Sequence, residues 1–167
     1  MPPEIVTIAQ KKDEKFLRTK TVPFAFDRFT RKEVNDLVAR MRRIMHEANG
    51  IGLSANQIGL SFAVFVAETP DAQGGTKFYA VFNPKIEKIS KETATFEEGC
   101  LSIPGIWGDV TRAAEIVVSG QNKMGKPVKV KAWGLLARIF QHEIDHLNGK
   151  LFIDRARHIH ESEQTAE

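Results

Sequence analysis

The sequence predicts an α+β fold in which mostly antiparallel strands surround a central helix that carries the motif His-Glu-x-x-His. Three observations support this prediction. Apolar residues recur at helical spacing between 30 and 50, short runs of β-type composition follow between 61 and 133, and a second helical pattern covers about 135–147. Helices that bracket a block of strands are typical of the α+β class.

The first predicted helix is amphipathic and lies on the N-terminal side of the strand block. It begins at Thr30, because Thr30 and Glu33 have the spacing of a capping box. Apolar residues then repeat every three or four positions until Gly50, which favours a helix end. They are Val34, Leu37, Val38, Met41, Ile44, Met45 and Ala48. One face of this helix is therefore expected to pack on a core.

The strand block consists of apolar runs that are separated by turn residues. These runs are 61–66, 77–82, parts of 86–102, and 115–120. The segment 121–127, QNKMGKP, contains turn-forming residues and precedes the alternating VKVKAW at 128–133. This succession predicts a hairpin, and hairpin-connected strands pair antiparallel.

The second predicted helix places Leu135, Ile139, His142 and His146 on one face, because they are spaced by four, three and four residues. The chain has 167 residues, and no repeat, low-complexity tract or linker divides it. We therefore expect residues 1–167 to form one domain.

The composition excludes several classes of protein. Hydrophobic residues make up 42% and charged residues 27% of the chain, as in globular proteins rather than disordered or fibrous ones. The longest apolar run, 62–67, is far shorter than the roughly 20 residues of a membrane span. The first sixteen residues lack the pattern of a secretory or transit peptide. These features predict a bacterial-type cytosolic location, cytoplasmic rather than secreted, with no membrane partner.

The formal net charge of +3 is too small to indicate sequence-specific nucleic-acid binding. Residues 11–46 contain eleven Lys and Arg against five Asp and Glu, whereas the last seven residues, ESEQTAE, carry three acids and no base. We interpret the basic segment as a solvated surface. The alternative is that this segment binds an acidic or RNA-rich partner.

Residues 142–146 read His-Glu-Ile-Asp-His. On a helix, His142 and His146 are neighbours on one face and can bind one cation, while Glu143 can hold a water on that cation. The alternative is a pair of core histidines that bind no metal.

A catalytic divalent metal requires a third protein ligand. The metzincin pattern fails because Phe152 occupies the position of its third histidine, and a thermolysin-like site is disfavoured because later glutamates occur only in ESEQTAE. Cys100 remains, as the only cysteine of the chain. A thiolate is a strong ligand for Zn²⁺ or Fe²⁺, although Cys100 could instead fill a core or act as a nucleophile.

Three stretches of the chain resemble the peptide deformylase family, which removes the formyl group from the N-terminal methionine of new bacterial and organellar proteins. They are GIGLSANQ at 50–57, EGCLS at 98–102 and QHEIDH at 141–146. They occur in the order of that family, with Gln57 lying 43 residues before Cys100 and Cys100 lying 42 before His142. The resemblance covers roughly residues 40–155.

This resemblance implies a role for each matching residue. The metal ligands would be Cys100, His142 and His146. Glu143 would be the general acid and base, while the side-chain amide of Gln57 and the backbone N–H of Leu101 would hold the formyl oxygen as it gains negative charge. One thiolate and two imidazoles do not by themselves select one metal. The resemblance implies Fe²⁺ in the cell, with Zn²⁺, Ni²⁺ or Co²⁺ as substitutes.

A narrow apolar pocket for the methionine side chain is expected beside the metal. Helical spacing places Ile139 and Leu135 near the two histidines, so they are candidates for its walls. The alternative is that both residues only belong to the hydrophobic core. The resemblance adds the further candidates Phe96, Gly50, Ile51 and Gly52. It also implies that Arg112 pairs with Asp145 and so supports the metal-binding helix.

The chain departs from the family pattern at several positions. Ser54 replaces the usual first alanine of the 50–57 stretch, and Asn56 stands where many members have proline or another residue. Trp107 occupies the place of an arginine that contacts the substrate backbone in some bacterial members. The short acidic end replaces a basic ribosome-docking helix, so at most weak ribosome association is expected.

The leading functional hypothesis is therefore a monomeric metal-dependent hydrolase that acts on N-formylmethionyl nascent peptides and releases formate. A metallopeptidase is one alternative, disfavoured by Phe152. A non-catalytic, metal-stabilised binding module is the other. It is disfavoured by Glu143 and Gln57, which a structural metal site does not need.

Overall fold

The computed structural model describes residues 4–162 and confirms the α+β fold class. The helices are α1 Lys11–Leu17, α2 Arg31–Glu47 and α3 Gly134–Leu147. The strands are β1 Gly52–Ser54, β2 Val64–Pro70, β3 Thr76–Ile89, β4 Thr93–Cys100, β5 Ile103–Ala113, β6 Glu115–Gln121, β7 Pro127–Trp133 and β8 Arg157–Glu161. Short 3-10 turns cover Phe26–Arg28, Ala55–Ile58 and Phe152–Asp154.

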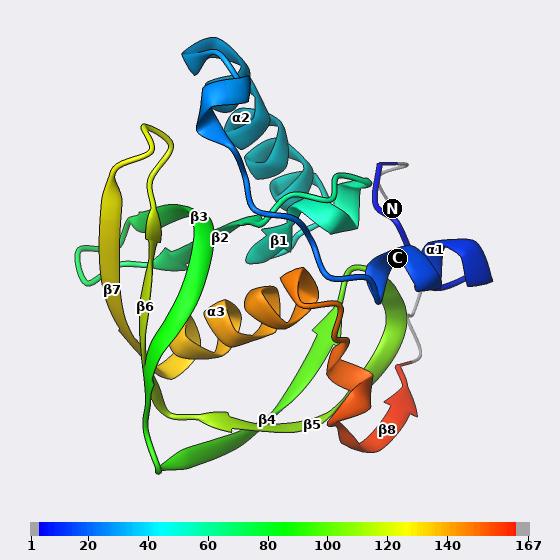
Figure 1. Ribbon diagram of the computed structural model, residues 1–167. Helices are drawn as coiled ribbons and strands as arrows, with labels where there is room; N and C mark the ends of the chain where they lie inside the picture. The colour runs from blue at the N-terminus through cyan, green and yellow to red at the C-terminus, as the bar shows by residue number, and fades with distance from the viewer. Residues whose placement is uncertain (1–3, 163–167) are drawn as a thin grey trace.

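The strands form two antiparallel sheets with α3 between them (Figure 1). The large sheet has the order β1-β2-β3-β6-β7 and the small sheet has the order β4-β5-β8. The chain leaves the large sheet after β3, forms the β4–β5 hairpin, and returns as β6. Helix α3 contacts β1, β2, β6 and β7 of the large sheet and β5 of the small one. This enclosure explains why eight of its fourteen residues are buried.

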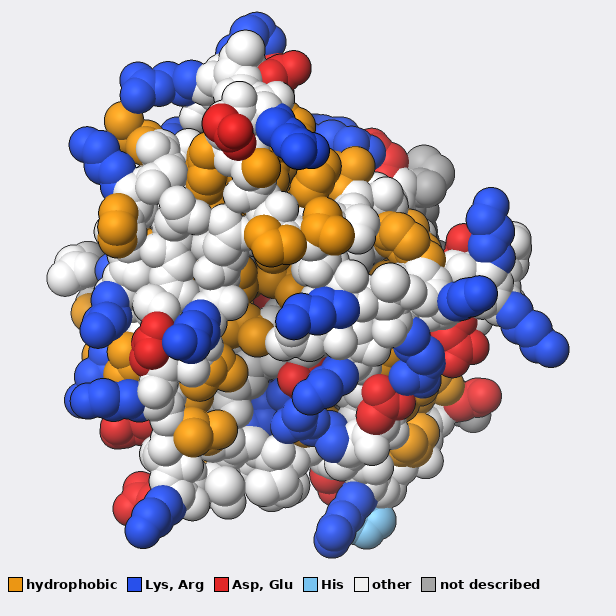
Figure 2. Space-filling model, in the orientation of Figure 1, with side chains coloured by type: hydrophobic (Ala, Val, Ile, Leu, Met, Phe, Trp, Pro, Cys, Tyr) orange, Lys and Arg blue, Asp and Glu red, His pale blue; other side chains and the backbone are white. Residues whose placement is uncertain are grey.

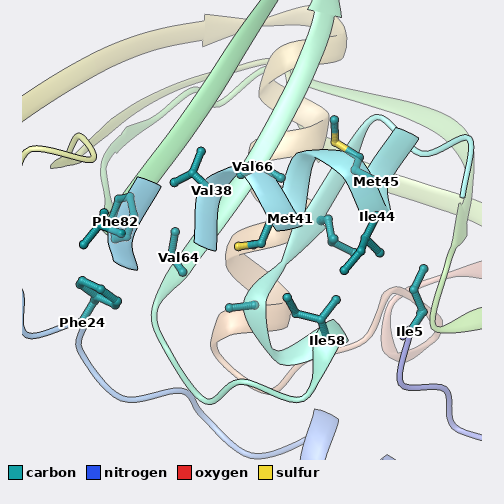
Figure 3. Close-up of a cluster of buried hydrophobic side chains, with 13 residues drawn as sticks. Ile5, Phe24, Val38, Met41, Ile44, Met45, Ile58, Val64, Val66 and Phe82 are labelled. Atoms are coloured by element: carbon teal, nitrogen blue, oxygen red, sulfur yellow. The ribbon is translucent and has the colours of Figure 1, made fainter. Parts of the chain in front are cut away.

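Helix α2 covers the first hydrophobic core and begins as the sequence predicts. Thr30 Oγ1 accepts a hydrogen bond from the Glu33 N–H at 3.1 Å, and Glu33 Oε2 accepts one from the Thr30 N–H at 2.7 Å. The apolar face of the helix lies against β2, β3 and the Ala55–Ile58 turn (Figure 3). The side chains in this cluster include Val38, Met41, Ile44, Met45, Ile58, Val64, Val66 and Phe82.

Helix α3 is attached to both sheets. On the side of the large sheet, the rings of Phe140 and Phe65 meet edge to face with centroids 5.0 Å apart. On the other side, the Gln141 amide accepts from the Ala113 N–H at 3.1 Å and donates to the Ala113 carbonyl at 3.0 Å. These contacts fix the orientation of the helix about its own axis.

The basic segment 11–46 is largely balanced by nearby acids. Arg18, Lys32 and Arg43 form i,i+4 ion pairs along α1 and α2, and Arg40 reaches Glu4. On the face shown in Figure 2, Lys and Arg side chains are spread out and interspersed with Asp and Glu. This distribution favours the solvated-surface interpretation.

The helix α1 and the strands β1, β5 and β8 were not predicted from the sequence. Helix α1 has only seven residues and one buried side chain, Leu17, so it shows little periodicity. Every residue of β8 is exposed, which removes the alternation that marks a strand. Strand β1 has three residues. The acidic residues 163–167 lie outside the described range. None of the helices formed by residues 4–162 has the length and apolar composition that crossing a membrane requires.

Glu68 joins α2 to the large sheet through a buried carboxylate. It accepts hydrogen bonds from Arg42 Nη2 at 2.6 Å and Thr76 Oγ1 at 2.9 Å, and it also contacts the His46 ring. The hydrogen bond from Arg42, helped by those from His46 and Thr76, outweighs the effect of burial and lowers the pKa of Glu68 to about 2. The folded protein therefore favours the charged form of this side chain.

We predict that Glu68→Gln destabilises the protein by about 1 kcal/mol at pH 7, a value discounted because Arg42 and His46 are about half exposed. Because the folded state lowers this pKa from 4.5 to about 2, the stabilisation is complete above about pH 4.5 and disappears as the pH falls towards 2. Urea unfolding of the chelator-treated proteins at pH 7 and pH 3 measures the difference. An equal difference at both pH values would contradict the assignment.

Candidate active site

The two histidines of the HEIDH motif lie one turn apart on α3, with ring centroids separated by 5.0 Å. His146 is fully buried, whereas His142 is partly exposed. Burial lowers the pKa of His146 well below its usual value. This keeps the imidazole neutral, which is the form that binds a metal.

Cys100 reaches these histidines from the small sheet. It ends β4 at a bulge, where Gly99 pairs with Trp107 but Cys100 pairs with Ile103. The bulge turns the sulfur towards α3, where Cys100 Sγ lies 3.2 Å from His146 Nε2. One ligand atom from each of Cys100, His142 and His146 lies within 4.8 Å of the others.

This cluster fits a divalent metal ion. One sulfur and two imidazole nitrogens are the donor set that Zn²⁺ and Fe²⁺ accept, and tetrahedral sites with bonds of about 2.0–2.3 Å place their ligand atoms about 3.3–3.6 Å apart. Burial lowers the pKa of His142, but hydrogen bonds to Cys100 and Glu98 outweigh it and raise the pKa to about 10.

Glu98 lies behind His142 and was missed as a site residue by the sequence reasoning, which used it only as a letter of EGCLS. Its Oε1 lies 2.8 Å from His142 Nδ1, and it accepts two hydrogen bonds from Arg112, at 2.6 and 2.9 Å. Arg138 Nη1 adds a fourth contact at 2.5 Å. Burial favours the neutral acid, but Arg112 and His142 outweigh it and hold the pKa of Glu98 far below its usual value. Its carboxylate therefore only accepts, so His142 Nδ1 donates and Nε2 is left free to ligate.

The structure also brings together Arg112 and Asp145. Arg112 Nη1 lies 3.0 Å from Asp145 Oδ2, and the Arg112 side chain is almost fully buried. Arg112 thus connects Glu98 on β4 with Asp145 on α3. A buried guanidinium with two acidic partners fixes α3 against the small sheet.

Glu143 and Gln57 line the same cavity as Cys100 and His142. Burial raises the pKa of Glu143, whose Oε2 lies 2.7 Å from Ser54 Oγ. Gln57 Oε1 accepts from the Ser54 N–H at 3.0 Å, so the amide nitrogen points the other way, 3.1 Å from Ser102 Oγ and 3.7 Å from Cys100 Sγ. The arrangement sets a carboxylate and an N–H donor beside the cluster.

A cavity of about 1020 Å³ opens in front of the cluster. Its lining includes the predicted wall residues Gly50, Ile51, Gly52, Leu135 and Ile139, together with Leu101 and Trp107. Ile139 also belongs to the hydrophobic core, whereas Leu135 is half exposed. The alternative that these residues are core positions therefore holds for Ile139 and not for Leu135.

Phe96 does not line this cavity. It is 63% exposed, and the Arg138 guanidinium lies 5.2 Å from its ring centroid. Phe96 precedes Cys100 by four residues on β4, which is roughly 13 Å along an extended strand. The expectation that Phe96 forms a wall of the methionine pocket is therefore wrong for this cavity.

We predict that Glu98→Gln lowers the affinity for Zn²⁺ by about 10- to 100-fold, because His142 loses the anionic partner that orients its ring. Titration against a chromogenic chelator measures the affinity, and circular dichroism checks that the variant is folded. Glu97→Gln, which removes the same charge from the exposed face of the same strand, is the matched control. Equal affinities in the two variants would show that Glu98 does not support the ligand.

Comparison with known proteins identifies the same family as the three motifs. A family model described as polypeptide deformylase matches residues 4–162. A peptide deformylase of Prochlorococcus marinus is 47% identical over 125 residues, which cover 75% of this chain and 62% of that protein. The chain thus spans less than two thirds of the length of this relative.

Solved structures resemble the whole described fold. A probable peptide deformylase from Synechococcus phage S-SSM7 has a TM-score of 0.81 at 41% identity, covering 90% of this chain and 97% of that one. The Met-Ala-Ser-bound class I type b peptide deformylase of Acinetobacter baumannii has a TM-score of 0.81 at 31% identity, covering 91% and 96%. The likeness therefore extends over both sheets and α3.

Proposed function

The chain belongs to the peptide deformylase family, and on this basis we propose that it hydrolyses the formamide bond of N-formylmethionyl peptides. The observation that carries the proposal is the grouping of Cys100, His142 and His146 with Glu143 and Gln57 at one cavity. A carboxylate, an N–H donor and a metal-ligand set are the groups that amide hydrolysis requires.

Cys100, His142 and His146 would hold one divalent ion, which we propose is Fe²⁺ in the cell, replaceable by Zn²⁺, Ni²⁺ or Co²⁺. Such an ion supplies an acidified water and a Lewis acid for the formyl oxygen. Glu98 and Arg112 keep His142 in the tautomer that this role needs.

The chain's own residues would carry the proton and the charge. Glu143 takes a proton from water as the water oxygen attacks the formyl carbon. The side-chain N–H of Gln57 and the backbone N–H of Leu101 donate to the formyl oxygen while it is negative. Glu143 then gives its proton to the amine nitrogen as the C–N bond breaks. The products are formate and a peptide with a free N-terminal methionine.

The cavity beside the cluster is suited to the methionine side chain. Ile139 and Leu135 provide an apolar wall on α3, and the turn from Gly50 to Gly52 allows the peptide backbone to approach closely. We further propose that the substrates are nascent chains in a bacterial-type cytosol, and that the enzyme is a monomer with at most weak ribosome association.

The direct test is formate release from formyl-Met-Ala-Ser by the purified protein. We expect activity after loading with Fe²⁺, Ni²⁺ or Co²⁺, with Zn²⁺ as a further substitute, and loss of activity with a chelator. If none of these ions supports formate release while the protein retains metal, the chain is a metal-stabilised binding module and the proposal is wrong.

We predict that Glu143→Gln retains the metal but loses at least about 100-fold in kcat, because the carboxylate moves protons and is not a ligand. Metal analysis and the formate assay are made on the same preparation. If metal and activity disappear together, Glu143 is a ligand and its proposed role is wrong.

A further inference from the structure

Ser54 is a buried polar residue that none of the roles above explains. It is the last residue of β1, is completely inaccessible to solvent, and stands where the family resemblance leads one to expect alanine. Its main chain and its side chain each contact one proposed catalytic residue, Gln57 and Glu143 respectively. An added hydroxyl in a closed space needs a partner, because an unpaired buried hydroxyl is costly.

The Ser54 hydroxyl has one proton and two acceptors within reach. Its Oγ lies 2.7 Å from Glu143 Oε2 and 3.0 Å from the Glu143 main-chain oxygen. A hydrogen bond to a charged carboxylate is shorter and stronger than one to a neutral carbonyl. The hydroxyl therefore holds Oε2 whenever Glu143 is charged.

The second carboxylate oxygen lies against Gly52. A methyl group at Gly52 would be only 2.6 Å from Glu143 Oε1 and 2.9 Å from Ile139, so the missing side chain provides the space for this oxygen. Gly52 lines the cavity. The carboxylate is thus held with Oε2 on Ser54 and Oε1 at the cavity wall.

We propose that Ser54 is a positioning residue that fixes the Glu143 carboxylate so that Oε1 faces the substrate cavity. This inference rests on the proposed deformylase function. With Oε2 occupied by the hydroxyl, proton transfer to and from substrate takes place at Oε1. A proton-transfer group that is restricted to one orientation spends less time in unproductive ones.

Ser54 contacts Gln57 through its main chain and Glu143 through its side chain, so a side-chain substitution can test the contact with Glu143. The Ser54 N–H orients Gln57 by donating to its Oε1, and this bond does not involve the hydroxyl. Ser54→Ala therefore removes the contact with Glu143 while it retains the main-chain N–H that donates to Gln57 Oε1. An effect of this variant can be assigned to the carboxylate.

A purely structural role would be to attach β1 to α3 through the Glu143 main-chain oxygen. The chain offers a matched control for that role. Thr21 Oγ1 donates to the Leu147 carbonyl of α3 at 2.9 Å in a buried position away from the cavity. Thr21→Val removes this hydroxyl with almost no change in side-chain volume.

The experiment compares the wild-type protein, Ser54→Ala and Thr21→Val, each loaded with Ni²⁺, in the formyl-Met-Ala-Ser assay. We expect Ser54→Ala to lose about tenfold in kcat, with KM within about twofold and metal content unchanged. Thr21→Val should retain the wild-type kcat. Both variants should melt about 2 to 4 °C earlier.

A Ser54→Ala kcat within twofold of wild type, or an equal kcat loss in Thr21→Val, would overturn the proposal. Crystal structures of metal-free wild type and Ser54→Ala provide a readout that does not need activity. The Glu143 carboxylate should rotate or become disordered only in the variant, and an unchanged carboxylate would equally overturn the assignment. Absence of formate release by the wild type would instead refute the deformylase function.

Discussion

The site depends on one buried carboxylate. Glu98 holds Arg112 from β5 and both Arg138 and His142 from α3. Each of its oxygens has two partners, so the burial of this charge is compensated by hydrogen bonds on every side. Without Glu98, two guanidinium groups would be left without this anionic partner, and the strand that carries Cys100 would keep only its weaker link to α3 through the Arg138 hydrogen bond to the Ala94 carbonyl. The separation of the two sheets is therefore set by charge as well as by apolar packing.

Helix α3 is enclosed because it contacts both sheets. Its large-sheet side is packed through Phe140 and its small-sheet side is hydrogen-bonded through Gln141 and Arg138. With both faces occupied, the imidazoles of His142 and His146 have no freedom to leave the cavity. Ile139 is at once a core residue and a cavity wall, so the shape of the cavity is maintained by the stability of the core.

Sequence periodicity predicted the elements that bury one face or alternate regularly. Helix α2 and helix α3 start and end within a few residues of their expected bounds, and β6 and β7 form the expected hairpin. Strand β5 was obscured because its bulge between Ile103 and Trp107 breaks the alternation, and β8 because both of its faces are exposed. Local pattern carries no information about a strand that is stabilised mainly by its partner's backbone.

The ligand set and the residues around it differ in how far sequence could predict them. Cys100, His142 and His146 follow from residue chemistry and motif order, but nothing local joins Glu98 to an arginine 40 residues later in the chain. The same holds for Ser54 and Glu143, which are 89 residues apart. Such contacts exist only because the β4–β5 hairpin and β1 pack on opposite sides of one helix. Since the proposed metal ligands come from both α3 and the small sheet, metal binding would also join these two units, and its free energy would add to the free energy of unfolding.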